Sequence, residues 1–303
     1  MFNQAVNILR REFPDPSPIQ APEEDKWLQY KRLLPHVSTL REIYMNENEL
    51  MPGTFSGSEA FVTILSEAGI NQWDQGVNRE GLEMVTAAEY ILVHDLKDNS
   101  SPLKADMDVL IALMMERGIA ERRDALERRK NVLNLRRKFA QESSPLSLEE
   151  DIKLYNAYSD LAFSLLEYND YIQAEKLFKI CHKKYRQWEN EGYQNVSWEW
   201  VKYWNAMASI RMLQGRYPEA ERAAEEAMYL AGQMGNKSGV LKWKFLLATI
   251  YLQNGEFDRA LKVHREVRDE RREKAGVFNE LTLESCYAVG AIHELLNQYE
   301  DAE

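Results

Sequence analysis

The chain has 303 residues, with 38 Lys and Arg against 49 Asp and Glu, a formal net charge of −11 and 45% hydrophobic residues. This is the composition of a foldable globular protein, and its acidic balance argues against a protein that coats nucleic acid or anionic lipid, since both select excess Lys and Arg. We also expect no membrane span and no secretory signal, because the apolar stretches are too short and no small-residue cleavage site follows the first residues. Only Cys181 and Cys286 occur, which is too few for a disulfide framework and predicts a reduced, cytoplasmic location.

Helix is expected almost throughout the chain, because there are only 14 Gly and 9 Pro among many strong helix formers. Two helices, at 2–12 and 27–48, make an N-terminal helical segment in which Pro35 falls inside the second helix. The remainder reads as helix pairs: 58–71 with 79–97, 104–117 with 119–142, 148–168 with 171–190, 197–214 with 217–233, 237–254 with 257–274, and 279–297 with a stub from 299.

We therefore predict three segments along the chain. Residues 1–52 form an N-terminal cap, residues 53–145 hold two degenerate helix pairs, and residues 146–303 hold regular repeats, the last of them incomplete.

The repeats are marked by small residues at fixed positions. Alanines spaced 46, 40 and 42 residues apart each follow an aromatic by three residues, and another small residue stands twelve positions before each of them. Two helices of a hairpin approach closely only where small side chains meet, so these positions predict the helix contacts. The alanines are Ala174, Ala220, Ala260 and Ala302, and their partners are Ala162, Ala208, Ala248 and Gly290.

Glycines mark the turns of the same pattern. Gly215 and Gly255 precede their alanines by five residues, where a helix ends and a positive φ is needed. With a weaker fit the pattern continues towards the N-terminus, in Gly69, Gly76, Gly81 and Ala88, and then in Gly118 and Ala125.

This arrangement of small residue, turn, aromatic and alanine resembles the tetratricopeptide repeat family. One unit matches the motif at Trp204, Met207, Ala208, Gly215, Tyr217, Ala220 and Ala227, and the long helix over 264–276 is similar to the kinesin-light-chain type of repeat. The resemblance covers 148–303 well and 58–142 loosely. It implies an all-α fold, a right-handed superhelical solenoid of antiparallel helix pairs, and a protein-interaction scaffold that binds a peptide or partner helix in its concave groove.

A second resemblance concerns the N-terminal third. The stretches AVNILRREFP (5–14), KRLLPHVSTL (31–40) and ILSEAGINQWDQG (64–76) are similar to the segment that joins an NB-ARC or NACHT module to its repeats in fungal signal-transduction ATPases. The chain has no GxxxxGK[ST] loop, so the ATPase module itself is absent. The resemblance implies a partner-binding or effector-sensing arm.

The sequence offers no catalytic residues, metal ligands or cofactor site. None of the five histidines stands in an HExxH pattern, and there is no G-x-S-x-G or G-x-G-x-x-G motif. We therefore favour a non-enzymatic role, without metal or cofactor. The alternative stays open that the solenoid serves as an enzyme or small-molecule sensor with the same groove as its pocket, because such a site needs none of these motifs.

The expected groove is lined by the first helix of each pair. Asn205 is suited to hold a peptide backbone, and Lys202 and Lys242 are suited to pair with a carboxylate. Ordinary exposed helix surface is the competing interpretation. The full set of predicted groove residues is Asn156, Phe163, Lys202, Asn205, Ser209, Lys242, Phe245 and Tyr287.

The segment 116–138 is strongly basic, with nine basic against four acidic residues, a net charge of 9 − 4 = +5. One interpretation is a solvated helix with local pairs such as Asp124 with Arg128. The other is an anchoring patch for an acidic partner; nucleic acid is disfavoured because no aromatics alternate with the arginines. The candidate patch residues are Arg122, Arg128, Arg129 and Arg136.

The last residues fall within an unfinished hairpin. We expect this to leave Val289, Ile292 and Leu296 uncovered, which predicts either a fragment of a longer protein or self-association through the open end.

Overall fold

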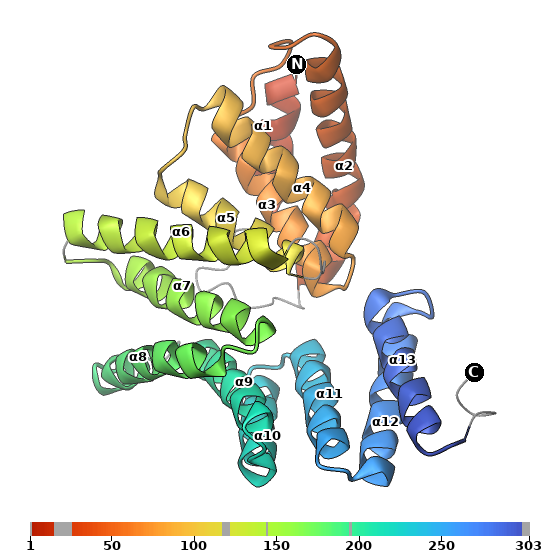
Figure 1. Cartoon of the computed structure of the whole chain (residues 1–303). Coiled ribbons are helices and arrows are strands. Elements are labelled where there is room, and N and C mark those ends of the chain that lie inside the picture. The colour runs from red at the N-terminus through yellow and green to blue at the C-terminus, as the bar shows by residue number, and fades with distance from the viewer. Residues whose placement is uncertain (1, 15–25, 117–121, 144, 194–195, 299–303) are drawn as a thin grey trace. The chain divides into compact units, whose positions relative to one another are not determined.

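The computed structural model describes residues 2–14, 26–116, 122–143, 145–193 and 196–298 (Figure 1). Over these residues the chain is helical and contains no strand. Contacts divide it into two compact units, residues 1–164 and 165–303, and each is described by itself. The all-α fold of consecutive packed helix pairs is as predicted. The division into the segments 1–52, 53–145 and 146–303 rests on sequence patterns and remains a prediction.

The first unit runs from the N-terminus into α7. Its helices are α1 (Phe2–Glu12), α2 (Trp27–Leu50), α3 (Glu59–Asp74), α4 (Asn78–Tyr90), a π-helical turn η2 (Ile91–Asp95), α5 (Pro102–Met115), α6 (Arg122–Glu142) and most of α7 (Leu148–Glu167). The pairs α3 with α4 and α5 with α6 pack together, and α4 packs on α5.

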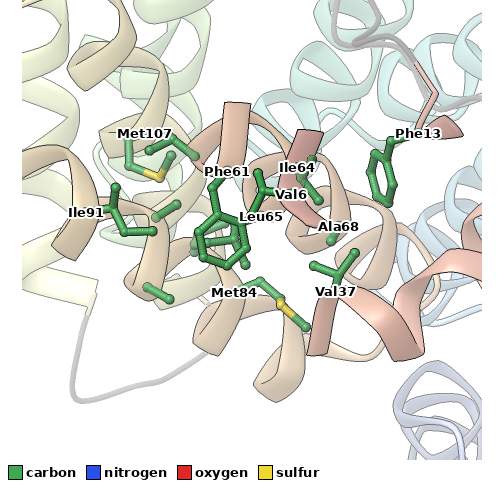
Figure 2. Packing of buried hydrophobic residues seen from close by; sticks show 14 of the residues in the cluster. Val6, Phe13, Val37, Phe61, Ile64, Leu65, Ala68, Met84, Ile91 and Met107 are labelled. Carbon is green, nitrogen blue, oxygen red and sulfur yellow. The ribbon is translucent and has the colours of Figure 1, made fainter. Parts of the chain in front are cut away.

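A hydrophobic core joins the N-terminal helices to the first helix pair (Figure 2). Val6 of α1 and Val37 of α2 are fully buried with Phe61 and Leu65 of α3 and with Met84 of α4. The N-terminal helical segment is therefore part of the core of this unit and not a detached extension.

The small-residue contact predicted for α3 and α4 is present at Gly69 and Gly81. A Cβ atom on Gly81 would lie 3.0 Å from the carbonyl oxygen of Gly69, and one on Gly69 would lie 2.6 Å from Cγ1 of Val85. The two backbones approach so closely that only glycine fits without displacement of its neighbours. The predicted turn at Gly118 lies outside the described residues.

The second unit contains the regular repeats. Its helices are α8 (Tyr171–Asn190), α9 (Ser197–Leu213), α10 (Tyr217–Gln233), α11 (Lys237–Gln253), α12 (Phe257–Ala275) and α13 (Glu280–Leu295). The pairs α9 with α10 and α11 with α12 pack closely, as do α10 with α11 and α12 with α13. Ala208, Ala220, Ala248 and Ala260 are all completely buried, which confirms these predicted small-residue positions. Gly290 is only half-buried, and the predicted partner Ala302 lies outside the described residues.

The turns of the repeats use the left-handed backbone region. Gly215 has φ +71° and Gly255 φ +80°, and Asn169, at the same place before α8, has φ +57°. Asparagine tolerates this region better than other residues with a side chain, so it replaces glycine there at low cost. None of the described helices is both long and apolar enough to cross a lipid bilayer.

Candidate interaction surface

Two tryptophans join the first helices of neighbouring repeats in the second unit. The rings of Trp198 on α9 and Trp243 on α11 meet edge to face with centroids 6.0 Å apart. Both belong to a cluster with the buried residues Val201, Ala227 and Ala231. The helices α9 and α11, which carry five of the predicted groove residues, are therefore neighbours in this unit.

The α9 part of this surface is a polar row at intervals of three and four residues. The ammonium of Lys202 lies 3.6 Å from Oε1 of Glu199, a carboxylate that is completely buried. Burial raises the pKa of the Glu199 carboxyl, and the charge of Lys202 counteracts that rise. One turn further on, Ser209 Oγ donates to the carbonyl of Asn205 at 3.3 Å, and Lys202, Asn205 and Ser209 are all half-buried.

The α11 part is built around the half-buried Phe245. The imidazole of His264 meets its ring edge to face at 4.7 Å, and the guanidinium of Arg271 lies 4.9 Å from its centroid. Arg271 also donates from Nη1 to the carbonyl of Leu281 at 2.8 Å and to Ser285 Oγ at 2.9 Å. Arg271 therefore supports Phe245 and ties α12 to α13, a role that sequence spacing gave no signal for.

The buried His264 is in an unfavourable environment for charge. Neither of its ring nitrogens has a hydrogen-bond partner among the described residues. Burial and the nearby Arg271 lower the pKa of His264 to about 4, so the ring is neutral at physiological pH.

The remaining predicted groove residues divide between the two units. Lys242 is exposed on α11, and Tyr287 on α13 is 80% exposed. Asn156, which is buried, and Phe163, which is half-buried, lie on α7 in the first unit. Lys202, Asn205 and Ser209 lie on α9, and Lys242 and Phe245 lie on the neighbouring α11. That these residues form one groove remains a prediction.

The prediction that Val289 and Ile292 lack a cover is wrong. Val289 is 5% exposed and Ile292 is completely buried, while Leu296 is half-buried. They lie on the same side of α13 as Ser285 and His293, which bond to α12 through Arg271 and Arg265. The exposed apolar residues of α13 are instead Leu283, Tyr287 and Leu295.

The arginines of α6 point mostly into the first unit. Arg128 Nη1 lies 2.7 Å from Oε1 of Glu89 and also pairs with Asp108. Although burial alone would raise it, Arg128 and Lys104 hold the pKa of Glu89 below its ordinary value. These partners come from α4 and α5, so Arg128 makes a tertiary contact and not the local pair with Asp124 that the sequence suggested.

Two further arginines of α6 are almost completely buried. Arg129 pairs with Glu116 at 3.3 Å and with Asp160 at 3.2 Å. Arg136 pairs with Glu150 at 3.0 Å and with Asp106. The fourth candidate, Arg122, is half-buried and donates to the carbonyl of Glu116 at 3.4 Å. Much of the positive charge that we expected on the surface thus connects α6 to α5 and α7.

Aromatic residues near the start of α9 serve mainly as packing. Tyr185 stacks on Trp188 with centroids 5.5 Å apart and meets Trp200 edge to face at 5.7 Å. All three are buried, together with Cys181, whereas Cys286 on α13 is exposed. The described residues contain no cluster of His, Cys, Asp and Glu that could hold a metal ion.

Comparison with known proteins agrees with this geometry. A family model described as "Tetratricopeptide repeat" matches residues 201–273, which span α9 to α12. This part of the chain is therefore similar to tetratricopeptide repeats. No curated protein sequence matches the chain.

Two solved structures share the fold of this chain. One is a Rap protein complexed with Competence and Sporulation Factor, with a TM-score of 0.58 and 16% identity over 92% of this chain and 68% of the other. The other is a tetratricopeptide repeat protein from Parabacteroides merdae, with a TM-score of 0.50 and 16% identity over 99% of this chain and 90% of the other. At this identity the likeness is one of fold.

Proposed function

We propose that this tetratricopeptide repeat protein is an interaction scaffold that binds an extended peptide or a partner helix on the α9–α11 surface. The observation that carries the proposal is the half-buried polar row of Lys202, Asn205 and Ser209 on α9, together with the half-buried Phe245 on the neighbouring helix α11. Amides and hydroxyls satisfy a peptide backbone, and a half-buried aromatic ring provides an apolar anchor. The Rap protein of similar fold was solved in complex with a factor, which supports a binding role.

The charges of the surface favour a ligand with a carboxylate. Lys242 is exposed, and Lys202 is already 3.6 Å from the buried Glu199. A ligand carboxylate near Lys202 would share its ammonium with Glu199. Exposed charge pairs are worth less than about 1 kcal/mol each, so the apolar anchor at Phe245 is expected to matter at least as much.

Replacement of the groove residues tests the proposal. Affinity capture with the intact chain is compared with capture by a variant that carries Lys202→Ala, Asn205→Ala and Lys242→Ala. The matched control carries Lys237→Ala, Asn254→Ala and Lys262→Ala, the same residue types at exposed positions elsewhere in the second unit. Partners lost from the groove variant and kept by the control support the proposal, and identical partner sets for all three proteins reject it.

The finer resemblances extend the same proposal. We propose a cytoplasmic protein whose repeats, of the kinesin-light-chain type, act as a partner-sensing arm like that of fungal NB-ARC or NACHT ATPases. The 40 and 42 residue spacings of the last alanines and the stretches at 5–14, 31–40 and 64–76 support it. Cell fractionation tests the location, and co-purification with a separate nucleotide-binding ATPase tests the pathway.

A further inference from the structure

The exposed side of α8 carries a row of basic and apolar side chains that the groove does not use. Ile172, Lys176, Lys179, Ile180 and Lys183 are all exposed, and their spacings of four, three, one and three residues place them on one face of the helix. We refer to these five residues as the α8 basic face. The opposite face is the one that packs, with Ala174, Phe178, Cys181, Tyr185 and Trp188 buried.

The positive charge of this face is not neutralised by its own helix. Lys176 and Lys183 make no ion pair among the described residues. Lys179 lies 3.5 Å from Glu175 and is itself 72% exposed. That carboxylate is engaged elsewhere, because Arg211 approaches it at 3.3 Å and Gln214 donates to it at 3.1 Å. The lysines are thus available to charges from outside the chain.

The equivalent helices of the next repeats differ. The exposed side of α10 carries Arg222, Glu225, Glu226 and Tyr229, and that of α12 mixes both signs, as at Lys262 and Glu266. The three helices hold the same position in their repeats. The basic and apolar composition of α8 is therefore a property of this helix and is not required by the repeat fold.

We propose that the α8 basic face docks an acidic amphipathic helix of a partner protein. Ile172 and Ile180 are 60% and 41% exposed, and eight residues of helix separate them by about 12 Å. A partner helix with two apolar residues at that spacing covers both isoleucines, and carboxylates beside them meet the three lysines. The surface is distinct from the α9–α11 surface and does not depend on it.

The charge of the chain as a whole selects this occupant over a polyanion. With a net charge of −11, the protein repels a membrane surface or a nucleic acid at long range, whereas a short acidic helix feels mainly the local lysines. The face also contains no aromatic ring on which a base could stack.

The test uses the full chain and a fluorescein-labelled synthetic helix of about 15 residues, with leucines seven or eight positions apart and glutamates around them. Fluorescence anisotropy gives its Kd for the wild type and for a variant with Lys176→Glu, Lys179→Glu and Lys183→Glu. The matched control carries Lys237→Glu, Lys262→Glu and Lys274→Glu, which changes the net charge equally at exposed lysines elsewhere in the second unit.

We expect the α8 variant to weaken binding about tenfold or more and the control to change it less than about twofold. A peptide with glutamine in place of glutamate is expected to bind at least about tenfold more weakly to the wild type. The variant Ile172→Ser with Ile180→Ser is expected to weaken binding without a change in net charge. If circular dichroism shows that the Glu variant is misfolded, the milder Lys176→Gln, Lys179→Gln and Lys183→Gln variant replaces it.

Several results would overturn the proposal. One is that the wild type shows no preference for the glutamate peptide, and another is that both triple variants lose peptide binding equally. A third is that the wild type binds phosphatidylserine vesicles or oligothymidylate more tightly than the peptide. The variant with Lys202→Ala, Asn205→Ala and Lys242→Ala is expected to bind the peptide as the wild type does. Loss of binding in that variant would move the site to the groove.

Discussion

The second helices α6 and α10 belong to different units, and α6 buries two arginines beside its apolar residues whereas α10 buries only alanines. On α6, Arg129 and Arg136 are buried in ion pairs with α5 and α7. On α10, the buried residues are Ala220, Ala223, Ala224, Ala227 and Ala231. Alanine packing holds a helix in place through shape, whereas buried ion pairs require every charge to keep its partner. The same helix-pair architecture thus rests on two kinds of contact.

The largest effect is expected from removal of a buried charge on α6. Arg129→Met leaves the carboxylates of Glu116 and Asp160 without their cation, and loss of one partner from a buried pair costs about 3–5 kcal/mol. Urea unfolding measures the change. Lys138→Met, at a side chain that is 72% exposed on the same helix, serves as control and is expected to change stability by less than about 0.5 kcal/mol. Equal effects at both positions would show that the buried pairs of Arg129 do not stabilise the protein more than an exposed lysine does.

A pH-dependent effect on stability is expected in the second unit, where the imidazole of His264 is buried without a hydrogen bond among the described residues. The pKa of His264 is lowered to about 4, so below about pH 6.5 the unfolded chain takes up a proton that the folded protein does not. The contribution of His264 to the free energy of unfolding is fully present above pH 6.5. It decreases by about 2–3 kcal/mol as the pH falls towards 4.

Comparison with a variant isolates this contribution. The difference in unfolding free energy between the wild type and His264→Phe is measured at several pH values between 7 and 4. The variant is expected to become more stable relative to the wild type as the pH falls. A constant difference would mean that the imidazole titrates normally in the folded protein.

A smaller effect is expected from overfilling the α9–α10 contact. Ala220→Leu introduces a large side chain at a completely buried position, and overpacking costs about 1–3 kcal/mol. Thermal unfolding followed by circular dichroism reports the change. The exposed position Glu225→Leu on the same helix is expected to be close to neutral, and a similar loss at both sites would contradict the packing role of the alanine.

The smallest effect is expected at a turn. Gly255→Ala places a side chain at φ +80°, which costs about 1 kcal/mol. Asn169→Gly, at φ +57°, is expected to leave stability nearly unchanged, since both residues accept this conformation. A destabilisation by Asn169→Gly larger than that by Gly255→Ala would show that the side chain of Asn169 does more than permit the turn.

The helix boundaries and the repeat contacts were predictable from the sequence because they depend on local rules. The alanine and glycine positions, the turns at Gly215 and Gly255, and the glycine contact between α3 and α4 were all derived from spacing alone. The family match covers only residues 201–273, where those rules are followed most regularly.

The surroundings of the charged residues were not predictable in the same way. The partners of Arg128 and Arg129 are 13 to 39 residues away in the sequence, at Glu89, Asp108, Glu116 and Asp160. A basic helix looks the same in sequence whether its arginines face solvent or buried carboxylates. Val289 and Ile292 were misplaced for a related reason, because α13 packs on α12 and is joined to it by bonds from Arg265 and Arg271 that no periodicity reveals.

The two cysteines provide an internal reporter for the second unit. Cys286 is exposed on α13, whereas Cys181 is completely buried on the packed side of α8. A thiol-reactive dye therefore labels one sulfur at once and the other only when α8 separates from its neighbours. The rate of the second labelling step measures how often this region opens in the native protein, and occupation of the α8 basic face by a partner is expected to slow it.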